Sequence, residues 1–567
     1  MKTLHSQLDP VSLEILMNGL RSVADESFVS LMKSAYSTNI KERRDHSTAI
    51  MDADGRLIVQ ADASLPVHLA SMKGLMESLL TRFGDDVRDG DLFVANDPYV
   101  AGGTHLPDIN MAVPVFADGA PVAFMCNIAH HADVGGAVPG SMAGGLTEIY
   151  QEGLRIPVIR LFREGVLQED IMDMILLNVR VPAERCGDYH AQIAACRLGH
   201  DRLAAMIAQY GVSAMHEGFD QIVTRTSNRI REEIKRLPDG VYRFEDVMDD
   251  DGVGAFDIPI KLTVTVNRGD ICFDFTGTAQ QVNGNINVTR NATQASVCYT
   301  LKALLDPDAP NNQGVLDLPE LITQKGTLLD ATFPAPVAAR ANTCQRIIDV
   351  ILGALAPAMP EAAVGAANGA NTTAVFSGVD PRSGEDYVYL ETLGGGFGGR
   401  SDNDGKDGVQ VHITNTSNLP VEAIEMEYPL RVRSYGLIPN SGGAGRYRGG
   451  MGLKRVVEPV GHSCSFNGAG ERFTHQPWGV FGGHYGATGE FRHVDREGVS
   501  RRLPNKPTSV AIHPGEALEI YSPGAGGYGD PAERSLGNLE VDLTSEKFDE
   551  AYLAAYYPQF GQSSEKQ

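Results

Sequence analysis

The sequence lacks the cysteine spacing and the long apolar segments that define several large classes of protein. Its seven cysteines include no CxxC pair, which excludes a thioredoxin-type site and a cysteine zinc site. Scattered cysteines in odd number are typical of reduced thiols in a cytosolic protein. No apolar run of about 18 residues occurs, and the first residues lack the apolar core of a secretory signal. We therefore expect a soluble, cytoplasmic protein.

Positive charge is also in short supply. The chain has 72 acidic and 48 basic residues, which gives a net charge of −24. An acidic chain has no bulk attraction for nucleic acids or for anionic membranes, so neither is an expected partner. At 567 residues the chain is longer than a single hydrophobic core usually supports, so more than one domain is expected. Its 62 glycines and 30 prolines favour many turns and loops.

Nucleotide-binding and common hydrolase motifs are missing as well. The chain has no P-loop (GxxxxGK followed by Ser or Thr), no HExxH and no GxSxG. Two GxGxxG matches, at 394–399 and 524–529, precede SDNDGKDG and DPAERS, which do not open a helix. A dinucleotide site needs such a helix to hold the pyrophosphate, so both matches are predicted loops. If this chemistry uses ATP, another chain is expected to bind it.

What the sequence does contain indicates a mixed α/β (α+β) multidomain fold. Residues 49–60 are predicted to form two short strands around a DADG turn. Apolar residues at helical spacing predict helices over 12–44, 69–83, much of 166–235, and 342–360.

The character of the chain changes twice along its length. Strand-like patterns with polar turns begin near residue 237, and glycine-rich loops alternate with short strands after about 360. We predict a helical and hairpin-containing metal-site domain over 1–236, a middle α/β domain over 237–435, and a glycine-rich, β-containing C-terminal domain over 436–567.

One predicted hairpin carries histidine and aspartate at its open end. INMAVPVF and PVAFMCNIA flank the turn ADGA, in which Asp118-Gly119 is a strong two-residue hairpin signal. Pairing Ala117 with Ala120 places position 108 opposite 129 and position 105 opposite 132. The clusters HLPD and HHAD then meet, with cross-strand side-chain bases about 5 Å apart.

This convergence is a candidate metal site. Imidazoles together with carboxylates suit zinc, manganese or ferrous iron, and carboxylates discourage copper(I). The HxxD spacing differs from the HxD of an iron facial triad, which disfavours an oxygenase. Asp45, at the predicted end of the first long helix, is a candidate oxygen ligand. The alternative is that these polar groups hydrogen-bond one another at the hairpin end, and the spacing leaves both interpretations open.

Several stretches together resemble the hydantoinase B/oxoprolinase family, in the same order and over nearly the whole chain: RRDHSTAIMDADGRLIVQA, NDPYVAGGTHLPD, HHADVGG, LGGGFGGR and YSPGAGGYGDP. The resemblance implies a subunit that holds a divalent metal, zinc before manganese or iron, through Asp45, His105, Asp108 and His130. It also implies a hydantoinase A-type partner that binds ATP and magnesium, in paired A–B units of the (AB)2 kind.

The resemblance and the predicted register disagree about one histidine. The register places His131 on the face of Asp108, whereas the family keeps the first histidine of the pair. Because a shift of one residue reverses the facing of a strand, we take His130 as the ligand. His131 becomes a catalytic candidate for proton transfer, and Asp133 a candidate for orienting a ligand imidazole.

The activity that the resemblance implies is the ATP-dependent hydrolysis of a cyclic amide such as a hydantoin, 5-oxoproline or a lactam. The partner would phosphorylate the ring carbonyl oxygen, and a metal-activated water would then attack the ring. Other relatives carboxylate ketones, but acetone-type carboxylase subunits are longer, which favours the hydrolase. A non-catalytic scaffold, in which the ion only pins the hairpin, is the third hypothesis.

Overall fold

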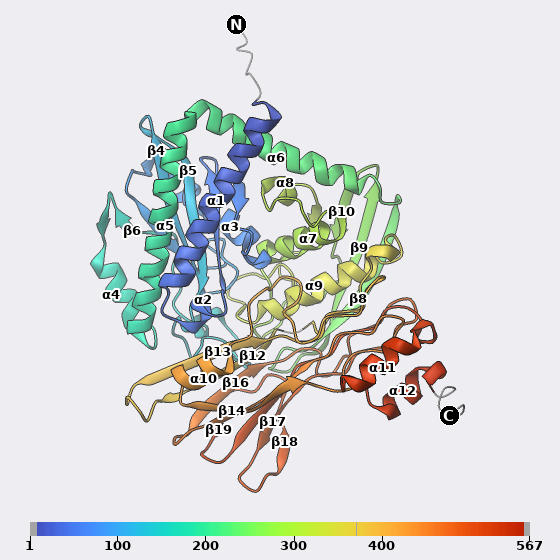
Figure 1. Ribbon diagram of the computed structural model, residues 1–567. Coiled ribbons are helices and arrows are strands. Elements are labelled where there is room, and N and C mark those ends of the chain that lie inside the picture. Colours follow the sequence, from blue (N-terminus) through green and yellow to red (C-terminus); the bar gives the residue numbers. More distant parts are fainter. Residues whose placement is uncertain (1–7, 370, 561–567) are drawn as a thin grey trace.

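The structure is a computed structural model that describes residues 8–369 and 371–560. Its strands form four sheets, and helices pack between and around them (Figure 1). Among the paired strands of the described residues, only β10 (Asp270–Asp274) and β11 (Glu320–Ile322) run parallel. The mixed α/β multidomain fold predicted from the sequence is confirmed.

The N-terminal strands form one antiparallel sheet in the order β2-β1-β5-β4-β3-β6-β7. The predicted pair around the DADG turn is β1 and β2, and the predicted hairpin is β4 and β5. The bounds are β1 His46–Asp52, β2 Leu57–Gln60, β3 Leu92–Ala95, β4 Asp108–Ala117, β5 Ala120–His130, β6 Ile159–Arg163 and β7 Val166–Leu167.

The hairpin of β4 and β5 has a two-residue turn followed by a β-bulge. Asp118 and Gly119 have φ of 52° and 81°, as a type I′ turn requires, and Ala117 pairs with Ala120 as predicted. Val122 is then left over, because Phe116 pairs with Pro121 whereas the next pair along the strands joins residues 115 and 123. The predicted register, 108 opposite 129, is therefore wrong by one residue: the bulge places position 108 opposite 130.

Helices cover both faces of this sheet. Apolar residues of α1 (Pro10–Ser34), α5 (Pro182–Tyr210) and α6 (Val212–Ile234) pack on one face, beside strand residues that include Met125. Helix α3 (Leu69–Phe83), whose predicted bounds are confirmed, packs on the other face. Figure 1 shows α1 and α5 running along β4 and β5.

The predicted helix over 12–44 is wrong beyond its first two-thirds. Helix α1 ends at Ser34, and the backbone amides of Tyr36 and Ser37 donate to the carboxylate of Asp188 at 2.9 and 3.0 Å. A side chain of α5 thus takes over amides that would otherwise continue the helix. The chain then makes the short helix α2 (Thr38–Lys41) and enters β1, so residue 45 precedes a strand.

The middle of the chain forms a second sheet, β11-β10-β9-β8, and two long helices. Every residue of α9 (Arg340–Leu355) is buried, and α9 packs against α7 (Arg290–Leu305), β8 (Gly240–Asp250) and β9 (Phe256–Asn267). One apolar core runs continuously from α3 through α7 and α9 to both sheets. Helix α9 corresponds to the predicted helix over 342–360.

The C-terminal third contains two more sheets with an aromatic core between them, which includes Phe376, Phe466 and Phe491. Their orders are β13-β12-β16-β19 and β14-β15-β20-β17-β18. The bounds are β12 Thr372–Val379, β13 Asp386–Leu393, β14 Leu430–Leu437, β15 Leu453–Pro459, β16 Cys464–Ala469, β17 Glu490–Val494, β18 Ser500–Arg502, β19 Val510–Ile512 and β20 Ala517–Tyr521. Since β12 pairs with β16, strands from both sides of the predicted boundary at 435/436 share a sheet; the division into three domains stays a prediction.

The remaining helices are short or lie near the chain ends. They are α4 Glu169–Leu177, α8 Gln313–Leu316, α10 Val421–Glu427, α11 Leu536–Thr544 and α12 Glu550–Tyr556, with 3-10 turns at Pro66–His68, Gly84–Asp86, Ile149–Gln151, Pro360–Ala362 and Pro531–Glu533. Residues 166–235 are mostly helical, as predicted. None of the helices in the described part of the chain combines the length and apolarity that a membrane crossing requires. All seven cysteines are free thiols.

The two GxGxxG segments are loops, as predicted, and they pack against each other. The Gly399 amide donates to the Gly526 carbonyl at 2.9 Å. A Cβ atom on Gly526 would lie 1.9 Å from the carbonyl oxygen of Trp478. Glycine is required at this position because backbones approach closely there.

Candidate metal centre

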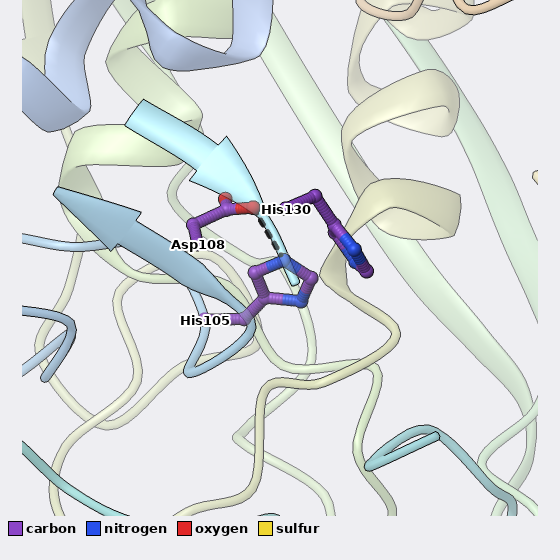
Figure 2. Close-up of side chains that lie close together, drawn as sticks. All are labelled: His105, Asp108 and His130. Carbon is purple, nitrogen blue, oxygen red and sulfur yellow. Dashed lines mark ion pairs between the residues drawn. The ribbon is translucent and has the colours of Figure 1, made fainter. Parts of the chain in front are cut away.

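Three buried side chains converge at the open end of the hairpin: His105, Asp108 and His130 (Figure 2). Each offers one ligand atom, and these three atoms lie within 4.8 Å of one another. Within residues 8–369 and 371–560, no other group of three histidine, cysteine or acidic side chains meets that criterion. The structure thus brings together three of the four predicted ligands.

The backbone explains why these side chains meet. Asp108 opens β4 and His130 ends β5, directly opposite each other, so both side chains lie on the same face of the sheet. The loop that carries His105 lies directly on α3. At Gly102, where φ is 70°, a Cβ atom would lie 2.1 Å from the carbonyl carbon of Gly74. Glycine is therefore required for the loop to hold His105 at this place.

His105 presents an unprotonated nitrogen to a carboxylate. Its Nδ1 lies 3.0 Å from the carbonyl oxygen of Ala338, so Nδ1–H must be the donor. Burial, and next the charge of Arg340, lower the pKa of His105, which keeps the ring neutral with a lone pair on Nε2. That Nε2 lies 2.9 Å from Asp108 Oδ1, yet neither atom makes a hydrogen bond. Two lone pairs at this distance repel each other, and a cation bound by both atoms would relieve that repulsion.

The second oxygen of Asp108 is held by other partners. Arg340, the first residue of α9, donates to Oδ2 at 2.6 Å, and the Thr104 hydroxyl donates to it at 3.1 Å. His68 Nε2 lies 3.7 Å from the same oxygen. Burial opposes ionisation, but the charge of Arg340 counteracts it, and the pKa of Asp108 lies well below its usual range. The site therefore contains a carboxylate.

His130 is also neutral at physiological pH. Burial lowers its pKa to about 3, although the charge of Asp45 opposes that change. Asn39 Nδ2 contacts the ring Nδ1 at 3.3 Å, and the backbone amide of His130 donates to the Asp45 carbonyl at 2.9 Å. Asp45 lines the same cavity, but its carboxylate is outside the group of three convergent ligand atoms.

The cavity around these residues has a volume of about 30 Å³. That is room for an ion with a water molecule. Its wall comes from distant parts of the chain: Asp45, Leu65, Val67, His68, His105, Asp108, His130, Met142, Arg340, Ala341, Asn371, Leu390, Thr392, Thr414 and Thr416. One carboxylate and two neutral imidazoles fit zinc, manganese or ferrous iron.

His131 and Asp133 lie outside this cavity. His131 points to the α5 face of the sheet, where its Nε2 meets Gln192 Oε1 at 2.9 Å. Asp133 accepts from the backbone amides of Gly135, Gly140 and Arg180, at 2.8 to 3.0 Å, and so organises the loop after β5. Neither side chain contacts a candidate ligand.

Three contributors to the site were missed in the sequence: Asn39, His68 and Arg340. His68 Nδ1 meets the Ser47 hydroxyl at 2.8 Å, and burial lowers the pKa of His68. Arg340 and Asp108 are 232 residues apart. No short-range sequence spacing connects these residues with the hairpin, so only the three-dimensional structure could reveal them.

The chain is similar to known proteins over most of its length. The sequence model described as hydantoinase B/oxoprolinase matches residues 9–531. The putative B-type subunit of a D-/L-hydantoinase from Pseudomonas sp. (strain NS671) is 33% identical, covering 96% of each chain. 5-Oxoprolinase 1 from Arabidopsis thaliana is 34% identical over 92% of this chain, which spans 42% of that longer protein.

Solved structures agree with this similarity. The crystal structure of ATP-dependent caprolactamase from Pseudomonas jessenii superposes with a TM-score of 0.91 at 27% identity, covering 97% of this chain and 96% of that one. A nucleotide-free acetone carboxylase has the same fold, with a TM-score of 0.88 at 19% identity over 97% of this chain and 79% of the other. With the family match and the motifs in order, the chain belongs to the hydantoinase B/oxoprolinase family.

Proposed function

We propose that this chain is the metal-binding B-type subunit of an ATP-dependent hydrolase that opens cyclic amides. The observation that carries the proposal is the buried convergence of His105, Asp108 and His130 within 4.8 Å. Relatives named hydantoinase, 5-oxoprolinase and caprolactamase support the substrate class. Hydantoin, 5-oxoproline and lactam rings share an amide whose resonance makes the carbonyl a poor electrophile.

The chain's own residues prepare the site for a cation. Ala338 fixes the tautomer of His105, Arg340 keeps Asp108 ionised, and Asp45 contributes negative charge beside His130. A divalent ion, zinc before manganese or iron, would supply Lewis acidity that brings the pKa of a water from 15.7 down toward 7. We propose Asp45 as a further ligand or a charge-balancing neighbour, and His131 as structural support for the hairpin.

ATP is assigned to a partner. The sequence has no P-loop, and two relatives are named as one member of a pair, the B-type subunit of a hydantoinase and the beta subunit of caprolactamase. We propose a hydantoinase A-type partner that binds ATP and magnesium and phosphorylates the ring carbonyl oxygen, in an (AB)2 assembly in the cytoplasm.

The test is turnover by the complex of this chain with its A-type partner. Hydantoin, 5-oxoproline and caprolactam are each incubated with and without ATP, and ring-opened product and ADP are quantified by mass spectrometry. We expect ADP-coupled ring opening of at least one substrate, and elemental analysis should find one divalent ion per chain. Asp108→Asn should remove both, while Asp45→Asn reports whether that carboxylate is needed.

A parallel reaction contains acetone or acetophenone with bicarbonate and ATP. Carboxylated ketone without any ring-opened product would overturn the hydrolase proposal in favour of a carboxylase. An unchanged turnover after loss of the ion would instead leave the ion a purely structural role.

A further inference from the structure

A second histidine–aspartate pair lies beside a much larger cavity. The metal cavity holds about 30 Å³, room for about two water-sized groups at roughly 10–15 Å³ each and too little for a ring of five or more non-hydrogen atoms. A neighbouring cavity measures about 520 Å³, within the range of small-molecule sites. We call it the α7–α9 cavity, lined by Tyr299, Thr300, Ala303, Leu304, Ile348, Leu352, Glu361, Ala362, Ala363, Val364, Phe397, Arg400, Ser401, Asp402 and His412.

Two segments of the chain contribute to both cavities. Helix α9 supplies Arg340 to the metal cavity and Ile348, about two turns further along, to the α7–α9 cavity. The segment that follows the glycine-rich loop supplies Thr414 to the metal cavity and His412 to the larger one. The two cavities therefore share two structural elements, helix α9 and the segment around residues 412–414.

The walls of the α7–α9 cavity suit a small ring. Tyr299, Ile348 and Phe397 provide apolar and aromatic surface, and the rings of Tyr299 and Phe397 lie 6.4 and 5.7 Å from the ring of His412. Flat, partly apolar ligands pack well against aromatic rings. The cavity thus offers an apolar surface with one imidazole among its aromatic groups.

That imidazole is fixed in one tautomer. His412 Nε2 lies 3.0 Å from Asp349 Oδ1, and Arg472 donates to the other oxygen of Asp349 at 2.8 Å. Asp349 is fully buried; burial opposes its ionisation, but the His412 hydrogen bond and the Arg472 charge lower its pKa. Because a carboxylate only accepts, His412 donates through Nε2–H, which in the neutral imidazole leaves Nδ1 as the acceptor of the ring.

The backbone at His412 also points to a constrained site. Its φ of 51° lies in the left-handed region, which non-glycine residues seldom adopt and which is enriched at ligand sites. Within the described residues, His412 Nδ1 makes no hydrogen bond. An oriented acceptor on a strained residue in a 520 Å³ cavity is the arrangement of a binding group rather than of a core histidine.

We propose that the α7–α9 cavity is a binding site for small, neutral ring compounds that carry an N–H donor, with the donor bonded to His412 Nδ1. The identity of the ring as a cyclic amide rests on the proposed function; the site itself rests on the His412–Asp349 pair and the aromatic walls.

The charge around the cavity sets a preference among rings. Glu361 and Asp402 carry two negative charges against the one positive charge of Arg400, which itself lies 3.8 Å from Asp402. A net negative lining disfavours an anionic ligand. Neutral rings such as hydantoin and 2-pyrrolidinone should therefore bind better than 5-oxoproline, whose carboxylate is ionised at neutral pH.

The test is a binding measurement on the purified full chain, with no ATP and no turnover. Dissociation constants for 2-pyrrolidinone, hydantoin and 5-oxoproline are measured by ligand-observed NMR or calorimetry. His412→Gln should weaken binding of the neutral rings about tenfold, since one buried hydrogen bond is lost. Ala303→Trp, an exposed position on α7 at the cavity, should block binding without removing a buried group.

Two control variants separate this site from the metal centre. His105→Ala should lose the ion but keep the affinity for the rings, and His216→Gln, an exposed histidine of α6, should change nothing. Ring affinity that is unchanged in both His412→Gln and Ala303→Trp, or that is lost in His105→Ala, would overturn the proposal. Intact binding with no ATP-dependent ring opening would leave this site standing and refute only the proposed function.

Discussion

Within the described residues, the buried pairs His105–Asp108 and His412–Asp349 have nearly the same separation and different chemistry. His105 Nε2 lies 2.9 Å from Asp108, and His412 Nε2 lies 3.0 Å from Asp349. The second contact is a hydrogen bond, whereas the first places two atoms without hydrogen bonds face to face.

The two pairs differ because the ring nitrogen that does not face the aspartate has a different partner in each histidine. His105 donates its only proton to the Ala338 carbonyl and turns a lone pair toward Asp108, which creates a place for a cation. His412 donates its proton to Asp349 and keeps a lone pair for a ligand. A carboxylate next to an imidazole is therefore not diagnostic by itself: the partner of the second nitrogen must be known as well.

The largest effect should come from removing the lone pair that faces Asp108. His105→Ala should reduce bound metal from one ion per chain to less than a tenth, and turnover by the complex more than about a hundredfold. The measurements are elemental analysis and ADP-coupled product formation, with circular dichroism to verify folding.

A matched control is His131→Gln, on the opposite face of the sheet. This variant should keep the ion and most of the turnover, although it disturbs the contact with Gln192. If His131→Gln loses turnover while it keeps the ion and the fold, then His131 takes part in the reaction after all.

A smaller effect is expected from Arg340, which donates to Asp108 and, being a cation, would not bind the ion itself. Arg340→Met should weaken metal affinity about 10- to 100-fold, because the carboxylate loses the charge that keeps it ionised. Removing that charge raises the pKa of Asp108, so the variant should release metal at a higher pH than the native chain. Chelator competition between pH 5 and 7.5 measures this, and equal release curves would contradict the assignment.

Replacing Glu152 should have a smaller effect, on the stability of the chain, and that effect should depend on pH. It accepts from the amides of Val337 and Ala338, at 2.8 and 2.7 Å, and so supports the turn whose carbonyl fixes His105. Burial raises the pKa of Glu152 to about 8 from 4.5, although both amides oppose that change. Between these values the folded chain binds a proton that the unfolded chain has lost, so stability falls as pH rises.

Glu152→Gln imitates the protonated acid. Its melting temperature should therefore exceed that of the native chain by a few degrees at pH 9 and match it near pH 5. Thermal unfolding monitored by circular dichroism at the two pH values tests this prediction. A difference that does not change with pH would contradict a raised pKa at this position.

Local sequence patterns predicted much of the hairpin that carries the metal site, and little of what surrounds it. The bounds of α3, the turn at Asp118-Gly119 and the convergence of HLPD with HHAD follow from short-range periodicity and turn chemistry. The register did not, because nothing in PVAFMCNIA marks Val122 as bulged. That single residue decides whether His130 or His131 faces Asp108.

The second pair was not predictable at all. Asp349 and His412 are 63 residues apart, on a buried helix and an irregular segment, and neither belongs to a motif. The same holds for Arg340, which reaches Asp108 only because α9 begins beside the hairpin. Short spacing reveals sites built within one element, whereas sites built between elements require the fold.

The smallest effect is expected when the Asp→Asn substitution is made in the second pair, at Asp349. Asp349→Asn keeps an oxygen that can accept from His412 Nε2–H, so the tautomer is retained, and Arg472 keeps its contact with Asp246 at 2.8 Å. The bond becomes neutral rather than charge-assisted, which makes it about half as strong. Affinity for 2-pyrrolidinone should therefore fall only about threefold, whereas Asp108→Asn should abolish metal binding. If Asp349→Asn lowered ring affinity as strongly as Asp108→Asn lowers metal affinity, the two carboxylates would have the same role. The distinction based on the second ring nitrogen of each histidine would then be wrong.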